Sequence, residues 1–522
     1  MDKNSTFSFI QDLKEKGKSE VRDDELSREI YSTDASDYRK VPLAAVLPKS
    51  VDDLTAILAT TKEYKTGLIP RGGGSSLSGQ TVGSGLVADH SKYLNSILEL
   101  NSEEKWVWAE AGVTLERLNA FLAPYDLMVG PDPASSAVAT LAGMVGNNST
   151  GAHSIKYGMI SDHLLALEVV LAEGSRIVLE DKTSDEVAAL ASQNTAEGRL
   201  YREIPQILER YREEIETRYP GTWRNVAGYG LNRLLQGYQE RGVLNLAQLL
   251  AGSEGTLAYI TKVKLALVPR PKKTRLMILH FEDLAGALEQ VPTILKYKVA
   301  AGELMTYPLL KLADDHPFFG PQLREFLHGA PGAILIVEFA DQTGEDLESR
   351  AQNLEKGLID NGYDQPVTHC ATPEEISKVW GIRRSVLGLL LSRPRGTRRT
   401  TIIDDPTVPV EEMKHFTREI IEAGRKFGLS INFDAHASAG CLHMTPEIDL
   451  KTPEGVNILK QLSGEVVDIA IAHHGTSTGE HGDGLARSYF LERVYGKALY
   501  QAFKEVKSAF DPEGSLNPGK IV

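Results

Sequence analysis

The chain has only two cysteines, Cys370 and Cys441, among its 522 residues. This excludes a disulfide framework and an iron–sulfur cluster held by about four thiolates, so electron transfer would need another cofactor. Long apolar runs are also missing, because no stretch approaches the ~18 residues that span a bilayer. The first residues, MDKNSTFSFIQDL, lack the basic and apolar pattern of a secretory signal. We expect a cytoplasmic protein, and association with the inner face of the membrane stays open.

Basic residues are in the minority, since 57 Lys and Arg stand against 71 Asp and Glu, for a net charge of −14. Nucleic-acid binding needs clustered Lys and Arg, so no nucleic-acid partner is predicted. Hydrophobic residues make up 42% of the chain and charged residues 25%, which is typical of a globular protein. At ~100–200 residues per domain, the length predicts two to four domains.

Helix-like and strand-like segments alternate up to about residue 268, which favours an α+β fold. Ser50 precedes apolar residues at helical spacing and predicts a capped helix, and residues 67–70, 86–88 and 106–109 are predicted strands. Two prolines and four cations in residues 269–275 indicate a linker. Further strands are expected at 276–281 and 333–339, and helices at about 345–358 and 491–510.

Three glycine-rich segments suggest a ligand site. Residues 70–79 read PRGGGSSLSG and directly follow a predicted strand. Consecutive glycines allow close approach of the backbone, and free N–H groups with serine hydroxyls form a nest for phosphate. Residues 140–151 and 252–256 are similar in composition, although each alone could be a surface turn. Together the three segments predict a long ligand such as a dinucleotide.

Two other nucleotide motifs are rejected. No G-x-G-x-x-G opens a helix as a Rossmann nicotinamide site requires. Gly514, Gly519 and Lys520 resemble a phosphate loop, but Ile521 replaces its Ser or Thr and no helix can follow before the end of the sequence.

Histidines are concentrated between residues 436 and 481, which hold five of the 13. His436 and His443 can face one point from a strand–turn–strand, and Glu480 and His481 sit among glycines in GEHGDG. Two histidines and one carboxylate form a plausible divalent-metal site, which leaves His481 free to act as a base. Hydrogen-bonded structural histidines are the alternative. His473, His474 and His153 are assigned to that structural class.

In combination, the motifs of this sequence resemble those of the FAD-binding vanillyl-alcohol-oxidase (PCMH-type) superfamily. The motifs that carry the resemblance are the His436/His443 pair and residues 70–79, 131–134, 140–151, 252–256, 479–488 and 511–520. The most similar branch contains D-2-hydroxyacid dehydrogenases: bacterial D-lactate dehydrogenases, the glycolate oxidase flavoprotein subunit and D-2-hydroxyglutarate dehydrogenases. The resemblance implies a two-subdomain FAD-binding domain and an α+β cap domain for the substrate. The implied divisions are a lead-in at 1–37, the FAD-binding domain at 38–275, the cap at 276–475 and a C-terminal segment at 476–522 that returns to the FAD domain.

The resemblance also implies the cofactor contacts. Residues Arg71, Gly72, Gly73, Gly74, Ser75 and Ser76 would form the loop around the FAD pyrophosphate. Thr140, Gly143, Asn147 and Gly151 would line the cofactor, Glu254 to Ile260 would contact its adenine half, and Asn517 would lie near the isoalloxazine ring. The first glycine loop has no histidine of the kind that attaches FAD in the family, so a non-covalent flavin is expected.

The same resemblance implies His436, His443 and Glu480 as ligands of a divalent metal (Zn, Mn or Fe) and His481 as the base. Arg383, in Trp380-Gly-Ile-Arg383, would pair with the substrate carboxylate, although Arg384 could serve instead. The expected reaction oxidises a D-2-hydroxy acid, in the lactate, glycolate or 2-hydroxyglutarate class, by hydride transfer to flavin N5. A second substrate carboxylate could be met by residues 393–399, RPRGTRR, which more often would be a solvated loop.

The electron acceptor stays open. Relatives of this type often carry an iron–sulfur domain after the Asn-Pro-Gly-Lys segment, where this sequence ends, so an iron–sulfur domain or subunit, a quinone or a cytochrome could accept the electrons. Two alternative functions are a metal-free flavin alcohol or sugar oxidase that uses O₂ and a non-catalytic flavin-binding subunit. The histidine and glutamate set argues against the first.

Overall fold

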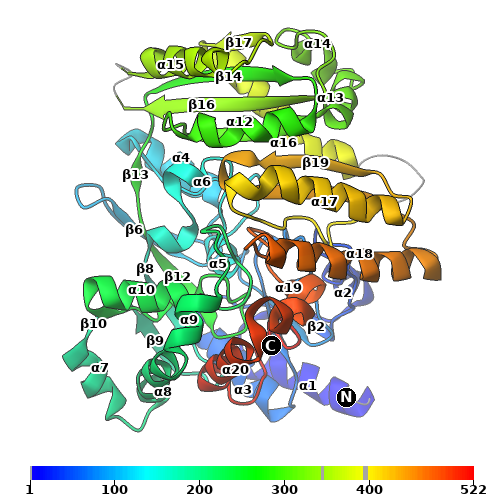
Figure 1. The fold of residues 1–522 in the computed structure, drawn as a ribbon. Coiled ribbons are helices and arrows are strands. Elements are labelled where there is room, and N and C mark those ends of the chain that lie inside the picture. Colours follow the sequence, from blue (N-terminus) through cyan, green and yellow to red (C-terminus); the bar gives the residue numbers. More distant parts are fainter. Residues whose placement is uncertain (1–2, 343–345, 392–397) are drawn as a thin grey trace.

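A computed structural model describes residues 3–342, 346–391 and 398–522. The chain forms an N-terminal region with two main sheets and a second region with one large sheet, and the C-terminal helix α20 returns to the first region (Figure 1). Helices and strands are mixed throughout, which confirms the predicted α+β class. None of the described helices is both long enough and apolar enough to cross a membrane.

The first sheet leads into the first glycine-rich loop, residues 70–79. Its strand order is β1 (Glu20–Arg22), β2 (Ala44–Leu47), β4 (Leu86–Asp89) and β3 (Leu68–Arg71), with β4 parallel to both β2 and β3. The residues of β2 and β4 are all buried, as expected for parallel strands covered on both faces. Helix α3 (Val51–Glu63) links β2 to β3 and begins at Ser50, which accepts a hydrogen bond from the Asp53 N–H as predicted. Helices α1 (Lys3–Lys16) and α2 (Glu25–Ile30) precede this sheet.

The second sheet is antiparallel. Its order is β5 (Ile97–Asn101), β6 (Trp106–Glu110), β12 (Tyr259–Ala266), β8 (Leu164–Val170) and β9 (Arg176–Leu179). The helices of this part are α4 (Leu115–Leu122), α5 (Leu141–Gly146), α6 (Ser154–Tyr157), α7 (Ser184–Ala191), α8 (Ala196–Arg210), α9 (Arg212–Arg218), α10 (Leu231–Arg241) and α11 (Ala247–Leu250). Apolar residues of α20 (Leu491–Phe510) share its core. This region also contains two short strand pairs. They are β7 (Leu127–Met128) with β13 (Val268–Pro269), and β10 (Lys182–Thr183) with β11 (Val243–Leu244).

The third sheet has helices on both faces. Its order is β17 (Val367–Cys370), β14 (Lys273–Phe281), β16 (Ala333–Asp341), β15 (Ala301–Thr306), β19 (Ile431–His436), β20 (Cys441–Ile448) and β18 (Arg398–Arg399). Alternate residues of β16 enter separate cores, with Leu335 and Val337 on one face and Ile336 on the other. The flanking helices are α12 (Leu284–Leu295), α13 (Tyr307–Asp314), α14 (Phe319–Leu323), α15 (Leu347–Asp360), α16 (Pro373–Leu391), α17 (Met413–Lys426) and α18 (Pro453–Ala472).

Two local expectations differ from the structure. The predicted linker is shorter, because Lys273 to Arg275 extend β14 and pair with residues 339–341 of β16. The second glycine-rich segment is not all loop, because residues 141–146 form α5, whose N-terminus is capped when Thr140 Oγ1 accepts from the Gly143 N–H. Small residues in that segment therefore serve a tight helix as well as an open turn.

Candidate functional site

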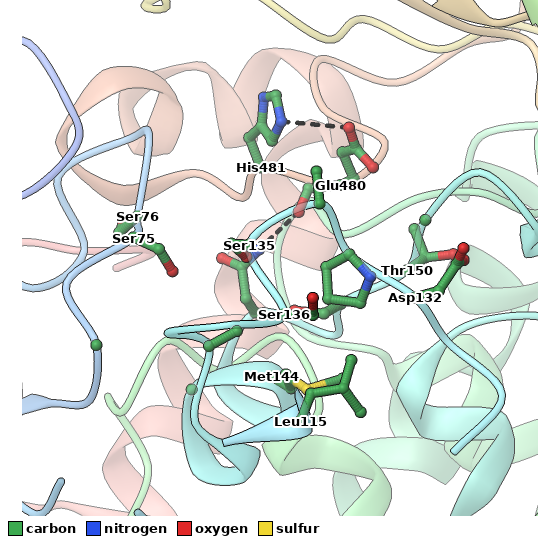
Figure 2. Close-up of a pocket in the computed structure, with 18 of the residues that line it drawn as sticks. Ser75, Ser76, Leu115, Asp132, Ser135, Ser136, Met144, Thr150, Glu480 and His481 are labelled. Carbon is green, nitrogen blue, oxygen red and sulfur yellow. Dashed lines mark hydrogen bonds and ion pairs between the residues drawn. The ribbon is translucent and has the colours of Figure 1, made fainter. Parts of the chain in front are cut away.

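A single cavity of about 860 Å³ joins the glycine-rich segments to the histidine cluster. Figure 2 shows Ser75 and Ser76 of the first loop, Thr150 of the second segment, and Glu480 and His481 on the walls of the same pocket. Of the residues expected around a cofactor, those that line the cavity are Gly72, Gly73, Gly74, Ser75, Ser76, Thr140, Gly143, Asn147, Gly151, Glu254 and Ile260. The size and length of this space suit an extended ligand rather than a small one.

The first glycine loop packs closely against the segment that follows residue 133. A Cβ at Gly73 would lie 2.0 Å from the carbonyl oxygen of Val138, and a Cβ at Gly72 would lie 2.2 Å from Thr140 Oγ1. Gly74 adopts a φ of +66°, which favours glycine. Within the described residues, the N–H groups of positions 73–76 donate no hydrogen bond to the protein. This cradle therefore fits a pyrophosphate, which accepts from such groups.

Side chains at the cofactor end also hold the backbone that carries the histidine end. Asn147 Nδ2 donates to the carbonyl of Glu480 at 2.6 Å, and Gln80 Nε2 donates to that of His481 at 2.5 Å. Glu254 accepts from the N–H groups of Asp483 at 2.6 Å and of Gly484 at 2.9 Å. Burial, with the charge of Asp483, raises the pKa of Glu254 to about 8.

Two expected cofactor residues are not on the cavity wall. The Arg71 guanidinium lies over the Tyr31 ring, 5.3 Å from its centroid, and burial lowers its pKa. Asn517 is buried, and its Nδ2 donates to the carbonyls of Gln80 at 2.9 Å and Glu254 at 2.6 Å. Asn517 therefore supports two residues that line the cavity, and Arg71 packs against a third, because a Cβ at Gly74 would lie 2.6 Å from Arg71 Nη2.

Three histidine rings converge on one carboxylate oxygen. The distances from Glu480 Oε1 to the Nε2 atoms are 3.3 Å for His436, 3.0 Å for His443 and 3.2 Å for His481. The other oxygen, Oε2, is paired with the buried Arg224. Burial raises the pKa of Glu480, but His436 and Arg224 outweigh it and hold that pKa well below its usual range.

The predicted ligands satisfy the chemistry of a divalent-cation site. His436, His443 and Glu480 each offer one ligand atom, and these atoms lie within 4.8 Å of one another. Neutral imidazole and carboxylate groups are ligands that Zn, Mn and Fe accept. The donor set therefore fits a divalent metal.

The imidazole Nδ1 atoms face further carboxylates. His436 Nδ1 lies 2.8 Å from Glu303 Oε1 on β15, and His481 Nδ1 lies 2.8 Å from Asp404 Oδ2. Burial disfavours the charged form of His481, but Asp405 and Asp404 raise its pKa to about 10. A divalent cation beside Glu480 would repel that positive charge and lower the pKa.

Asp405 organises the backbone of the loop that carries Glu480 and His481. Its Oδ2 accepts from the Thr478 hydroxyl at 2.8 Å and from the N–H groups of residues 479–481 at 3.1, 2.8 and 2.8 Å. Its Oδ1 lies 3.0 Å from the buried Arg487 guanidinium. Four donors to one oxygen fix the loop, so the directions of the Glu480 and His481 side chains depend on this carboxylate.

Arg383 lines the cavity from α16, but its guanidinium already has two acidic partners. It lies 3.0 Å from Glu303 and 3.1 Å from Asp434. Arg384 also lines the cavity and is exposed. Residues 393–397 lie outside the described residues, and so do the side chains of Arg398 and Arg399, which leaves the RPRGTRR segment without a structural account.

His153, which the sequence analysis assigned to the structural class, lies on the cavity wall. Its ring lies 2.6 Å from Asp132 through Nδ1 and 2.9 Å from Glu338 of β16 through Nε2. Burial opposes its charge, but these two carboxylates raise its pKa well above the usual value. Glu338 also accepts from the Trp380 indole at 2.6 Å. His153 therefore joins the two regions of the chain across the cavity.

Sequence reasoning missed Glu303, Asp404, Asp405, Arg224 and Glu338 as parts of this site. The one local signal was the adjacent acidic pair before Pro406, since two neighbouring carboxylates at a proline turn are unusual in a core. Glu303 and Glu338 lie within apolar strands, where a buried carboxylate requires a partner. That requirement, applied to the predicted strands, could have marked both residues.

Two family models match the chain. Residues 42–180 match an FAD binding domain, and residues 270–521 match the C-terminal domain of FAD linked oxidases. The glycine cradle lies in the first match and the histidine cluster lies in the second.

Curated relatives match over almost the whole chain. The glycolate oxidase subunit GlcD of Bacillus subtilis is 30% identical, with 98% of this chain and 97% of that protein covered. The D-2-hydroxyglutarate dehydrogenase of Escherichia coli K12 is 31% identical, with 99% of this chain covered. The alignment covers 52% of that relative, so the chain spans about half the length of the D-2-hydroxyglutarate dehydrogenases it matches. The mitochondrial D-lactate dehydrogenase [cytochrome] of Arabidopsis thaliana is 24% identical over 92% of this chain and 74% of that protein.

Solved structures share the fold. A p-cresol methylhydroxylase with substrate bound superposes with a TM-score of 0.71 at 14% identity, with 100% of this chain and 97% of that chain covered. An alkyldihydroxyacetonephosphate synthase gives a TM-score of 0.64 at 17% identity, covering 98% of this chain and 84% of that chain. These likenesses confirm the predicted PCMH-type fold.

Proposed function

The chain belongs to the family of FAD-linked oxidases, and we propose that it oxidises a D-2-hydroxy acid to the 2-oxo acid with non-covalently bound FAD. The names of three relatives support this substrate class, because hydroxyglutarate, glycolate and lactate are all 2-hydroxy acids. The observation that carries the proposal is the shared cavity, in which a pyrophosphate cradle and a histidine–carboxylate cluster face one space.

The glycine end of the cavity would hold the cofactor. The N–H groups of residues 73–76 would bind the pyrophosphate, Thr140, Gly143, Asn147 and Gly151 would line the cofactor, and Glu254 to Ile260 would contact its adenine half. Arg71 and Asn517 would act on the cofactor through the residues that they support. When bound, FAD supplies a two-electron acceptor for the hydrogen that leaves the substrate Cα.

The histidine end would activate the hydroxyl group. His436, His443 and Glu480 would hold a divalent metal (Zn, Mn or Fe), which supplies a Lewis acid that lowers the pKa of the substrate hydroxyl. His481 would take the hydroxyl proton at Nε2, the ring nitrogen that faces Glu480. Arg383 would bind the substrate carboxylate while it stays paired with Glu303 and Asp434. The exposed Arg384 is the second candidate for this role.

The electrons must then leave the flavin. An iron–sulfur domain or subunit, a quinone or a cytochrome would accept them, and the name of the Arabidopsis relative includes a cytochrome. The partner is proposed only as this class of one- or two-electron acceptor.

Anaerobic mixing of the FAD-loaded protein with a panel of D- and L-2-hydroxy acids tests the function directly. We expect bleaching of the flavin absorbance by at least one D acid and little by its L enantiomer. His481→Ala should retain FAD but lose at least ~10²-fold in the rate of flavin reduction, because the hydroxyl proton then has no acceptor. Arg418, a residue of α17 outside the cavity, supplies the matched control Arg418→Ala, which should reduce at the wild-type rate.

Other outcomes discriminate among the alternatives. A yellow protein that no 2-hydroxy acid bleaches would favour a non-catalytic flavin-binding subunit. Steady peroxide formation that survives verified removal of metal would favour a metal-free oxidase. Flavin reduction at a normal rate in His481→Ala would remove this histidine from the reaction.

A further inference from the structure

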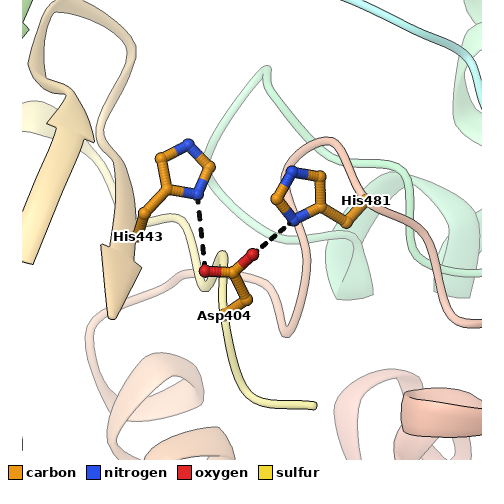
Figure 3. Close-up of side chains that lie close together, drawn as sticks. All are labelled: Asp404, His443 and His481. Atoms are coloured by element: carbon orange, nitrogen blue, oxygen red, sulfur yellow. Dashed lines mark ion pairs between the residues drawn. The ribbon is translucent and has the colours of Figure 1, made fainter. Parts of the chain in front are cut away.

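One buried carboxylate contacts two of the three clustered histidines. Asp404 lies in the loop between β18 and α17, and its Oδ2 is 2.8 Å from His481 Nδ1. Its Oδ1 is 3.7 Å from His443 Nδ1 (Figure 3). The two histidines come from different elements, β20 and the loop before α19 (Gly484–Arg487), so only this residue joins them on the Nδ1 side among the described residues.

The contacts of Asp404 decide which ring nitrogens face the cavity. Nδ1 lies on the Asp404 side of each ring, and the Nε2 atoms of His443 and His481 lie 3.0 Å and 3.2 Å from Glu480 Oε1. The two rings are stacked, with centroids 5.2 Å apart and an angle of 26° between their planes. A carboxylate behind an imidazole fixes both its tautomer and its orientation.

The neighbouring carboxylates have different tasks. Asp405 Oδ2 is occupied by the loop donors, and its Oδ1 lies 3.0 Å from Arg487 and 3.6 Å from His481 Nδ1, but Asp405 has no contact with His443. Glu303 stands behind His436 alone, and its second partner is Arg383. On the Nδ1 side of the rings, Asp404 is therefore the carboxylate among the described residues that contacts both a proposed metal ligand, His443, and the proposed base, His481.

We propose that Asp404 is a positioning residue that couples metal binding to the orientation of the base. This inference rests on the proposed function, because it presumes that His443 binds a metal and that His481 removes a proton. Asp404 lies behind both rings, so a change at Asp404 should displace a ligand and the base together, whereas a change at Glu303 should affect the ligand His436 and the guanidinium of Arg383 but not the base.

The test compares Asp404→Asn with Glu303→Gln, two substitutions that keep size and remove charge. Metal affinity is measured by competition with a chromophoric chelator in the FAD-loaded protein, and the limiting rate of flavin reduction is measured at saturating metal and substrate. Both variants should lose ~10–100-fold in metal affinity, as is typical when the partner of a ligating histidine is removed. When the metal site is full, Asp404→Asn should keep a limiting rate at least ~10-fold below that of Glu303→Gln, because only the first substitution also displaces the base.

Two results would overturn the coupling. Wild-type metal affinity in Asp404→Asn would remove the residue from the metal site, and recovery of the full rate at saturating metal would remove it from the base. If Asp404→Asn does not bind FAD, Asp404→Glu replaces it, because the longer side chain keeps the charge but displaces the carboxylate, and the same two results apply. Absence of flavin reduction in the wild type would instead contradict the proposed function, while the metal-affinity comparison would still test the ligand half of this inference.

Discussion

The glycine end of the cavity is made largely of backbone, whereas the histidine end is made of ionisable side chains. At the glycine end, residues 72 and 73 approach their neighbours so closely that a Cβ would collide with them, and free N–H groups form the surface. At the histidine end, three imidazoles, Glu480 and Arg224 interact within a buried cluster. The first end depends on the absence of side chains, and the second depends on the pairing of charges in a medium of low polarity.

This difference sets how each end should respond to damage. A backbone cradle is sensitive to added volume and carries no ionisable group of its own, so a pH dependence at this end must come from a neighbour such as His90. A charge cluster is sensitive to the loss of any one member, because each remaining charge is left buried without its partner. Three substitutions test the contrast.

The largest effect is expected from Arg224→Met. Arg224 is fully buried, donates to Ser154 Oγ at 2.8 Å and pairs with Glu480, so its loss leaves a buried carboxylate without its cation. We expect the free energy of unfolding of the FAD-loaded, metal-free protein to fall by ~3–5 kcal/mol, measured by chemical denaturation. Lys16→Met, which removes two exposed pairs, with Asp12 and Glu63, should leave stability nearly unchanged. Equal effects of the two substitutions would refute the contrast between buried and exposed charge.

A second, intermediate effect concerns His90 behind the glycine cradle. Burial, only partly offset by Asp89, lowers the pKa of His90 to about 4. Its ring nitrogens lie 3.3 Å from Tyr259 Oη and 3.2 Å from Thr140 Oγ1. In the unfolded chain a histidine binds its proton near pH 6.5, so between pH 6.5 and 4 the unfolded state binds more protons than the folded state. Stability should therefore fall with falling pH in this window, by about 3 kcal/mol in total from this group.

His90→Gln should flatten that part of the pH profile, because glutamine does not titrate. Denaturation curves at pH 6.5, 5.5 and 4.5 for both proteins give the difference. Since other groups titrate similarly in both proteins, only the difference between the profiles matters. Parallel profiles would show that the protonation of His90 is not linked to folding.

The smallest effect is expected from Gly73→Ala. The added Cβ would meet the Val138 carbonyl, so the loop must shift at a cost of about 1–3 kcal/mol, which corresponds to ~10–100-fold weaker FAD binding. Fluorescence titration of the apoprotein with FAD measures this loss. Gly381→Ala on α16 is the control, since nothing lies within 4 Å of its added Cβ, and it should bind FAD like wild type. Unchanged affinity in Gly73→Ala would place the pyrophosphate elsewhere.

The comparison also explains what the sequence could predict. The glycine cradle was predictable because its residues are consecutive and their chemistry is local. The strands at 276–281 and 333–339 are confirmed within β14 and β16, since their apolar runs are continuous. The helix at 491–510 is confirmed as α20, although Gly496 breaks its regular geometry with a φ of +79°.

The histidine end was only partly predictable. His436, His443, Glu480 and His481 are close in sequence or flank one hairpin, and the structure brings them together. The carboxylates behind them come from distant strands and loops. The sequence around Glu303 contains no pattern that predicts His436 as its partner. Trp380 and Arg383 illustrate the same limit: their spacing places them near one helix face, but the structure pairs them with Glu338 and Glu303.

The loop of residues 480–484 is held in place by side chains from the glycine end of the cavity. Its carbonyls and N–H groups are held by Asn147, Gln80 and Glu254, and two of these side chains were expected to line the flavin nucleotide. A ligand that fixes the positions of those side chains therefore also fixes the position of Glu480. If the proposed metal binds there, the nucleotide should strengthen binding of the ion, and by linkage the ion should strengthen binding of the nucleotide by the same factor.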